Sequence, residues 1–309
     1  MATDITSPGV AGIPDYLLNR TPVMFSLKAI EEWYENSIIE FMANTDYEGE
    51  IKAKGDRVTI RNAAGTTNIY DYEKNSTITY PQITTPDVTL IVDKAKGWSF
   101  GVDKIDKLQF DKDYMSEDQR NHVERLREQI QAEFLEDIYA TADATNQGAA
   151  AGRVSQNVNL GTSGTPRALT KADVTDFLVD CNQVLNENNV PTRDRYIVLP
   201  PPVISLLKKS DLKAANITGD DVGVIRNGMV GQVDGFNIIP SNQVPFNSGT
   251  SSWNCSFGHK YAVTWASQIT ESEILPRLEN THGAGYRGLR VYGYKTIKED
   301  GLGLGVVSV

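Results

Sequence analysis

The sequence holds one short motif that is typical of a nucleotide site. Gly283, Gly285 and Gly288 follow the spacing G-x-G-x-x-G, in which glycines let the backbone approach a pyrophosphate at a helix N-terminus. That chemistry requires a strand before the glycines and a helix after them. Residues 289–294 instead alternate like a strand. The motif therefore does not indicate a nucleotide site, although a small soluble nucleotide-binding enzyme stays open as an alternative.

Residues that ligate metals or act as nucleophiles are few and scattered. The three histidines, His122, His259 and His282, have no acidic or thiol residue at metal-ligand spacing. Cys181 lies in a helical pattern and is expected to be buried, and Cys255 is the only other cysteine. The sequence contains no serine nucleophile elbow and no phosphate-binding loop. It predicts no catalytic residue, no cofactor and no metal, and hence a protein that is not an enzyme.

Net charge and composition limit the classes of partner that the protein can bind. The 309 residues carry a formal net charge of -10, and no run of Lys and Arg offers the clustered charge that phosphate binding needs. No apolar run approaches the roughly 20 residues that span a bilayer. Residues 1–14 lack a signal-peptide pattern, and two cysteines cannot form a disulfide framework. We expect a soluble protein made in a reducing cytoplasm, without sequence-specific DNA binding or membrane contact.

The start of the chain is predicted to form an arm and a helix. Prolines and glycines within residues 8–22 interrupt regular structure. Ser26 is the expected N-cap of a helix with one apolar face. This face contains Leu27, Ile30, Tyr34, Ile38 and Phe41, and Trp33 and Met42 widen it.

Residues 56–102 alternate like a long two-stranded ribbon. The first limb is 57–61, the return limb runs over 88–92 and 97–102, and residues 63–76 form a polar tip. Prolines on the return limb favour an edge position, since proline cannot donate to a strand ladder. A lone ribbon is marginally stable in water, so we expect it to project and to contact another copy of the chain.

A long helix with a narrow apolar seam is predicted to follow, over residues 116–139. Ser116 and Gln119 match a capping box at its start. If it extended to Ala144, it would be about 40 Å long. Such a helix gains most of its stability from tertiary packing, so it needs a partner surface. The seam consists of Val123, Leu126, Ile130, Phe134 and Ile138.

A second unit begins after the Gly-, Ala- and Asn-rich residues 145–168. Thr170 is expected to cap a helix, and residues 196–199 read as a buried strand. Pro201 and Pro202 predict the first turn of another helix.

The rest of the chain is predicted to be mostly strand. An exposed loop at 219–231 precedes Asp234 and Gly235, which predict a hairpin turn. The strand-like segments are 261–265, 289–297 and 302–307.

Basic residues of the ribbon have two interpretations. They either keep an exposed strand edge soluble and unpaired, or they pair with acidic residues on the long helix of a neighbouring subunit. The second interpretation pairs the basic residues Lys52, Lys54, Arg57, Arg61 and Lys74 with the acidic residues Glu124, Glu128 and Asp137.

The order of these elements resembles that of the major capsid proteins of tailed bacteriophages, which have the Hong Kong 97-type fold. The resemblance covers nearly the whole chain and is strongest to podovirus coat proteins without an inserted domain. It rests on Gly55-Asp56-Arg57-Val58-Thr59-Ile60, on 102–109, on 196–200 with the short helix after it, and on 230–236 leading to Pro240-Ser241-Asn242.

The resemblance implies an α+β fold with an N-terminal arm, an extended β-hairpin loop, a long spine helix, an axial α/β domain and a C-terminal β return. The implied division is an arm and helix at 1–46, the extended loop at 47–100, a peripheral domain from 101–166 with 262–309, and the axial domain at 167–261. The loop near 219–228 is expected to face the centre of a capsomer.

The implied function is that of a major capsid protein. Copies would assemble as hexamers and pentamers into an icosahedral virion shell enclosing double-stranded DNA, in the host bacterial cytoplasm. The implied partners are a separate scaffolding protein, a portal and a decoration protein. The alternative is an encapsulin-like nanocompartment shell, which shares the fold but encloses enzymes.

Contacts between subunits are expected at the ribbon, the long helix and the axial loop. The residues predicted to make them are Arg57, Arg61, Asn68, Asp71, Lys74, Glu124, Glu128, Asp137, Asp220, Asp221 and Arg226.

Overall fold

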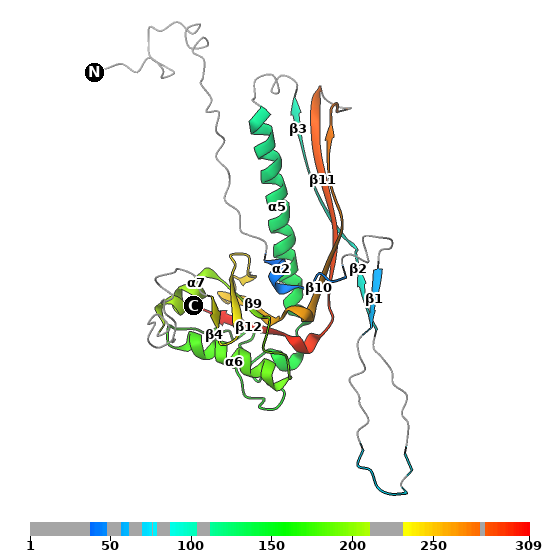
Figure 1. The fold of residues 1–309 in the computed structure, drawn as a ribbon. Helices are drawn as coiled ribbons and strands as arrows, with labels where there is room; N and C mark the ends of the chain where they lie inside the picture. The colour runs from blue at the N-terminus through cyan, green and yellow to red at the C-terminus, as the bar shows by residue number, and fades with distance from the viewer. Residues whose placement is uncertain are drawn as a thin grey trace, which may run out of the picture.

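A long helix and a three-stranded antiparallel sheet run side by side away from a globular α/β unit in the computed structural model (Figure 1). None of the helices in the described part of the chain is long and apolar enough to cross a membrane. The structure describes residues 38–47, 57–61, 70–75, 77–78, 87–103, 112–210, 231–278 and 282–309.

The long helix, α5, spans Lys112–Ile138 and continues as a 3-10 turn, η1, at Tyr139–Thr141. Its 27 residues give a length of about 40 Å. The predicted start at Ser116 is wrong, because the four residues before it contain no helix breaker and the helix includes them. Of the predicted seam, four residues are buried, but Val123 is 37% exposed. The seam therefore packs fully only in the half of α5 nearest the α/β unit.

The three-stranded sheet that accompanies α5 has the order β10-β11-β3. Its strands are β3 (Lys94–Asp103), β10 (Val263–Leu275) and β11 (Gly283–Thr296). β3 pairs antiparallel with β11, from Lys94 opposite Tyr292 to Asp103 opposite Gly283. The expectation that residues 97–102 continue the ribbon is therefore wrong. They pair with β11 because this places their alternate large side chains against α5.

The predicted ribbon itself is confirmed, with a shorter return limb. β1 (Arg57–Arg61) pairs antiparallel with β2 (Asp87–Ile91). The base of the ribbon packs on the sheet through the buried cluster Ile60, Leu90, Val92 and Ala266. The contact is close, because a Cβ atom on Gly293 of β11 would collide with the Ile91 backbone.

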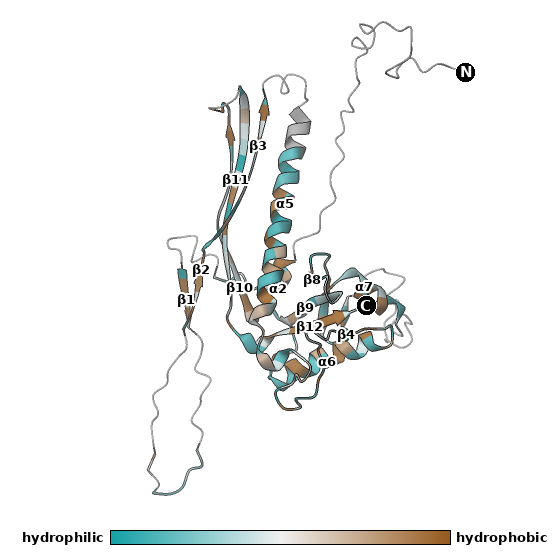
Figure 2. Ribbon diagram, turned by 180° about the vertical axis from the view of Figure 1, so that it is seen from behind, coloured by the Kyte–Doolittle hydropathy of each residue, from teal (hydrophilic) through white to brown (hydrophobic). Residues whose placement is uncertain are grey.

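The globular unit is built on a seven-stranded sheet. Along its main path the order is β4-β12-β9-β5-β7-β6, and β8 pairs with β9 at the side. The strands are β4 (Arg167–Ala168), β5 (Arg195–Leu199), β6 (Gln232–Val233), β7 (Phe236–Pro240), β8 (Phe246–Asn247), β9 (Ser252–His259) and β12 (Leu302–Ser308). β12 pairs with β9, so the last strand belongs to this sheet, whereas the predicted division groups it with the peripheral domain. Figure 2 shows hydrophobic residues gathered in these strands and hydrophilic stretches along α5.

Two helices, α6 (Asp173–Glu187) and α7 (Pro201–Lys209), belong to this unit. Prolines stand in the first turn of α7, as predicted. Thr170 is not the N-cap of α6, which is Ala172; the Thr170 hydroxyl instead donates a hydrogen bond to Asp173 at 2.5 Å.

The predicted hairpin turn joins β6 and β7. Asp234 (φ 47°) and Gly235 (φ 80°) both have positive φ, as a type I′ turn requires. The other 3-10 turns in the described part of the chain are η2 (Ala144–Asn146), η4 (Lys260–Ala262) and η5 (Glu299–Gly301).

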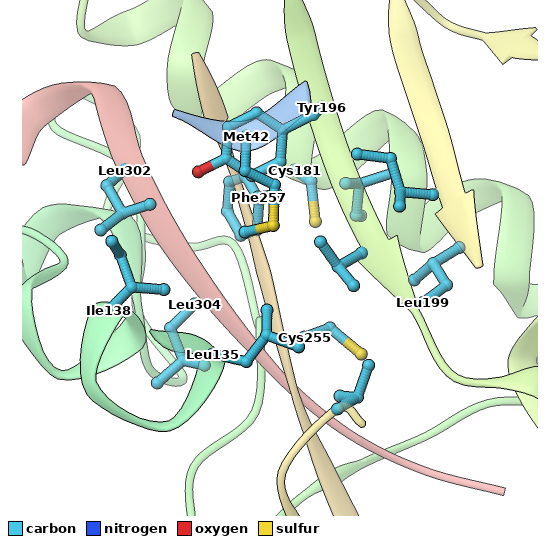
Figure 3. Packing of buried hydrophobic residues seen from close by; sticks show 14 of the residues in the cluster. Met42, Leu135, Ile138, Cys181, Tyr196, Leu199, Cys255, Phe257, Leu302 and Leu304 are labelled. Carbon is cyan, nitrogen blue, oxygen red and sulfur yellow. The ribbon is translucent and has the colours of Figure 1, made fainter. Parts of the chain in front are cut away.

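A short N-terminal element, α2 (Ile39–Met42), connects the units. Met42 is fully buried, and Figure 3 shows it with Tyr196 of β5 and Phe257 of β9 in one cluster. Phe41, predicted on the same apolar face, is 66% exposed, since the helix is only one turn long and its face ends there. Ile38 of the same predicted face is buried, and the remaining residues of that face lie outside the described part. One core thus joins α2, the lower half of α5 and the α/β sheet.

Candidate assembly surfaces

A cluster of charged and phenolic side chains holds α5 against the sheet. Lys94 Nζ on β3 donates hydrogen bonds to Glu133 Oε1 at 2.8 Å and to Asp137 Oδ2 at 2.7 Å, both on α5. Lys96 forms a second ion pair with Glu133. Tyr294 of β11 donates from its hydroxyl to Asp137 Oδ2 at 2.5 Å. We call these five residues the α5 clasp.

The protonation states of the α5 clasp favour the ion pairs. Partial burial opposes ionisation of Glu133, but hydrogen bonds from Lys94 and Lys96 outweigh it and lower its pKa. Burial likewise opposes the charge on Lys94, yet its contacts with Asp137, Glu133 and Tyr294 raise the pKa of the amine. The Asp137 pKa is lowered in the same way. Both carboxylates and the lysine are thus charged at neutral pH.

Aromatic rings pack beside the α5 clasp. Trp265 of β10 stacks on Tyr292 and Tyr294 of β11, with ring centroids 5.0 and 5.7 Å apart. Phe134 of α5 meets Trp265 and Tyr294 edge to face. The lower half of α5 is therefore fixed by both ion pairs and packed rings.

In the upper half of α5, stacked rings contact the sheet. His122 stacks on Phe100 of β3 with centroids 4.7 Å apart, and Phe100 stacks on Tyr286 of β11 at 4.9 Å. His122 is half-buried against these rings, and its Nδ1 lies 2.8 Å from the Asp118 carbonyl oxygen.

The ribbon and α5 lie on opposite faces of the three-stranded sheet. Lys94, Lys96 and Phe100 alternate along β3 and contact α5. On β11, Tyr292 and Tyr294 contact the same helix, so Gly293 between them faces the other way, and there the backbone of β2 crosses. Figure 1 shows β1 and β2 beyond the sheet as seen from α5. The sheet separates the basic ribbon from the acidic helix within one subunit.

The predicted acidic contact residues Asp137 and Glu124 have partners within the chain. Asp137 belongs to the α5 clasp, and both oxygens of Glu124 lie within 3.0 Å of Arg127 Nη1. Glu128 is half-buried on α5. These positions as subunit contacts stay a prediction.

The predicted contact residues of the ribbon are only partly described. Arg57 on β1 is exposed, as are Asp71 and Lys74 towards the tip, and Arg61 ends β1. The remaining predicted residues, Asn68, Asp220, Asp221 and Arg226, lie outside the described residues.

Sequence reasoning missed most of the α5 clasp, although a signal was present. Glu133 and Asp137 are four residues apart, which places them on one face of a helix. Lys94 and Lys96 alternate on one face of a strand. Pairing them required knowing that residues 94–103 lie beside α5.

The glycine-rich motif lies wholly within β11, so no helix follows it. A Cβ atom on Gly288 would collide with the Trp98 ring, which gives that glycine a packing role. Within the described ranges, no group of three His, Cys, Asp or Glu residues could hold a metal ion.

The remaining candidate residues have structural environments. His259 is 8% exposed, its Nδ1 accepts from the Tyr261 N–H at 3.1 Å, and burial lowers its pKa. Cys181 is buried, as predicted, and so is Cys255; both are free thiols whose pKa burial raises (Figure 3).

Residues 84–304 match the family model described as phage capsid protein. The chain belongs to this phage capsid protein family. The match covers the return limb of the ribbon, α5, the whole three-stranded sheet and most of the α/β unit. Membership confirms the predicted function of a major capsid protein that forms an icosahedral shell, and it does not favour the nanocompartment alternative.

Solved structures of similar fold cover almost the whole chain. One from Mycobacterium phage Che8 has a TM-score of 0.70 at 22% identity, over 93% of this chain and 97% of that one. The capsid structure of cyanophage P-SCSP1u has a TM-score of 0.71 at 15% identity, over 94% of each chain. The capsid asymmetric unit of cyanophage Pam1 gives 0.68 at 12% identity, over 94% and 97%. These likenesses confirm the predicted fold class, and the search of curated proteins gives no match.

Proposed function

We propose that this capsid protein assembles as hexamers and pentamers around double-stranded DNA, and that its ribbon reaches over a neighbouring subunit. The observation that carries the proposal is the position of the ribbon. The three-stranded sheet stands between the exposed Arg57 of the ribbon and the carboxylates of its own α5. A basic ribbon on one face and an acidic helix on the other are complementary between copies, which favours orientation of the contact.

The role we propose is structural and not enzymatic. A subunit with a net charge of -10 gives a shell wall that does not adsorb phosphate, although salt screens this beyond about 10 Å. We expect shell growth to need a separate scaffolding protein and a portal, with a decoration protein as a further partner. Synthesis and assembly would take place in the host bacterial cytoplasm.

Electron microscopy tests the proposal directly. The recombinant protein would be imaged by negative stain, alone and with a scaffolding protein from the same genome. We expect closed shells or large open polymers. A small discrete oligomer under both conditions would contradict the proposal, and shells filled with enzyme in place of DNA would support the nanocompartment alternative.

A charge-exchange experiment tests the ribbon contact. Arg57→Glu and Glu128→Arg are each expected to lower the yield of closed shells, and the double variant is expected to recover part of it. A second test deletes the ribbon tip, residues 63–76, which should leave a soluble subunit that does not close shells. Normal particles from that deletion would refute the ribbon contact while leaving the family assignment intact.

A further inference from the structure

Strands of the α/β unit and of the three-stranded sheet are connected through two 3-10 turns that contact each other. The turn η4 leads from β9 to β10, and the turn η5 leads from β11 to β12 (Figure 1). Just before η5, the backbone N–H groups of Ile297 and Lys298 donate to the Ala262 carbonyl oxygen of η4, at 2.8 and 3.2 Å. These hydrogen bonds tie the two turns into one joint between the units.

A single side chain, that of His259, caps the turn η4. His259 is the N-cap residue of this turn, and its Nδ1 accepts a hydrogen bond from the Tyr261 N–H at 3.1 Å. An imidazole nitrogen accepts a hydrogen bond only while it carries no proton. Protonation of Nδ1 would set two N–H donors against each other, so the cap of the turn would be lost.

The surroundings of His259 disfavour its charged form. The side chain is 8% exposed, and burial is the main cause that lowers its pKa below the ordinary value of 6.5. Arg195 lies directly opposite His259 in the β5–β9 pair, where like charges repel, and Lys298 adds a second positive charge. Asp194 and a hydrogen bond with the Arg193 backbone favour the charged ring, but they do not outweigh burial.

The other groups around the ring give the charged form little help. Tyr261 stacks on His259 with ring centroids 5.6 Å apart, but its ring is 53% exposed, where attraction between a cation and an aromatic face is weak. The remaining charged side chains on the elements around the ring are Arg193 before β5, Asp234, whose charge acts on Arg195, Lys260 of η4, and Glu299 and Asp300 of η5. At neutral pH the joint is therefore held by an uncharged histidine.

We propose that His259 is an acid-sensitive switch at the joint between the two units, which holds η4 in place when it is neutral and releases it when it is protonated. Release frees the Tyr261 N–H and weakens the hydrogen bonds between η4 and the segment before η5. The two units then gain freedom to turn relative to each other.

The pH range of the switch follows from linkage. Because the pKa of His259 is lowered in the folded protein, its contribution is complete above about pH 6.5 and is lost as the pH falls towards the lowered value. The carboxylates of the α5 clasp start to lose their charge only below about pH 4.5. The two effects therefore occur in separate pH ranges.

Hydrogen exchange of the full-length, unassembled subunit at pH 7, 6 and 5 tests the switch. Rates would be corrected for the intrinsic pH dependence of amide exchange. We expect peptides that cover 260–262 and 297–298 to exchange at least about threefold faster at pH 5 than at pH 7, while the buried strand β5 stays protected. The measurement needs no shell, so it does not depend on the proposed assembly.

Two variants separate the switch from a general effect of acid. His259→Asn keeps an acceptor oxygen for the Tyr261 N–H but does not titrate, so its exchange should not change between pH 7 and pH 5. His282→Gln is the matched control, since His282 is exposed directly before β11. We expect it to keep the pH response of the wild type.

Three results would overturn the proposal. One is a wild type whose joint exchanges no faster at pH 5, and another is an equal increase in His259→Asn. The third is an equal loss of protection in β5, which would mean that acid unfolds the whole α/β unit and not the joint alone. If His259→Asn does not fold, the comparison of the joint with β5 in the wild type still decides.

Discussion

The two halves of α5 differ in how the sheet holds them. The lower half buries Phe134 completely and carries the carboxylates of the α5 clasp. Among the described side chains of the upper half, His122 stacks on Phe100 and Val123 is 37% exposed. We therefore expect the described upper part of the helix to be locally less stable than its base, because local stability follows packing rather than secondary structure.

The substitution with the largest expected effect on stability removes a packed side chain from the lower half of α5. Phe134→Ala should lower the free energy of unfolding by about 3–5 kcal/mol, since it empties a fully buried ring site beside Trp265 and Tyr294. Val123→Ala in the upper half should change it by less than about 0.5 kcal/mol. Urea denaturation of the unassembled subunit measures the free energy of unfolding of both variants. Equal losses in the two would refute the difference between the two halves of α5.

A substitution within the α5 clasp should have the next largest effect on the free energy of unfolding. Lys94→Met removes the amine that binds two carboxylates and a phenol, so we expect a loss of about 1–2 kcal/mol, reduced from buried values because the group is partly exposed. Arg287→Met is the control, because its pair with Glu273 is more than half exposed and should contribute less than about 0.5 kcal/mol. A loss of unfolding free energy no larger than that of the control would contradict a stabilising role of the α5 clasp.

Lowering the pH should weaken the ion pairs of the α5 clasp before it affects the packed aromatic rings beside them. The pKa values of Glu133 and Asp137 are lowered in the folded protein from ordinary values of 4.5 and 3.8. Their contribution is therefore complete above about pH 4.5 and is lost as the pH falls through the lowered values. Urea denaturation at pH 7, 4.5 and 3 should show this decline in the wild type and a shallower one in Lys94→Met. Parallel curves would contradict the role of these carboxylates.

The substitution with the smallest expected effect on stability is at Glu187, outside α5, and is compared with those in the α5 clasp. Glu187 accepts hydrogen bonds from the backbone N–H groups of Val154 and Ser155 at 2.7 and 3.0 Å. Together with the Gln183 side chain, these bonds lower its pKa to about 2. The stabilisation is present above about pH 4.5 and is lost towards pH 2, and Glu187→Gln should cost less than about 1 kcal/mol because the group is solvated. Amide hydrogen exchange of residues 153–156 would detect the local change, and no faster exchange in the variant would contradict it.

Local signals in the sequence predicted the parts that local physics determines. The alternation of 57–61 and 88–92, the turn at Asp234 and Gly235, and the buried strand at 196–199 all appear in the structure. Each depends on residues close together in the chain. The capping box at Ser116 predicted the wrong start, because serine favours an N-cap but is also tolerated inside a helix.

The parts that the sequence did not predict depend on pairings between distant segments. Residues 97–102 have the same alternation whether they pair with the ribbon or with β11, so periodicity could not choose between them. The α5 clasp joins residues about 40 and 200 positions apart. A cavity lined by Arg127 and Arg290 likewise combines α5 with β11, and its residues carry no motif.

The pairing of β3 with β11 also sets an order of events during synthesis. β3 ends at Asp103 and β11 begins at Gly283, so the ribosome must add the intervening 180 or so residues before the two strands can meet. At ordinary rates of translation this takes on the order of 10 to 40 s. For that time β3 and α5 emerge without the strand that completes their surface. The spine of the shell subunit is therefore a late product of folding, formed only after most of the α/β unit has left the ribosome.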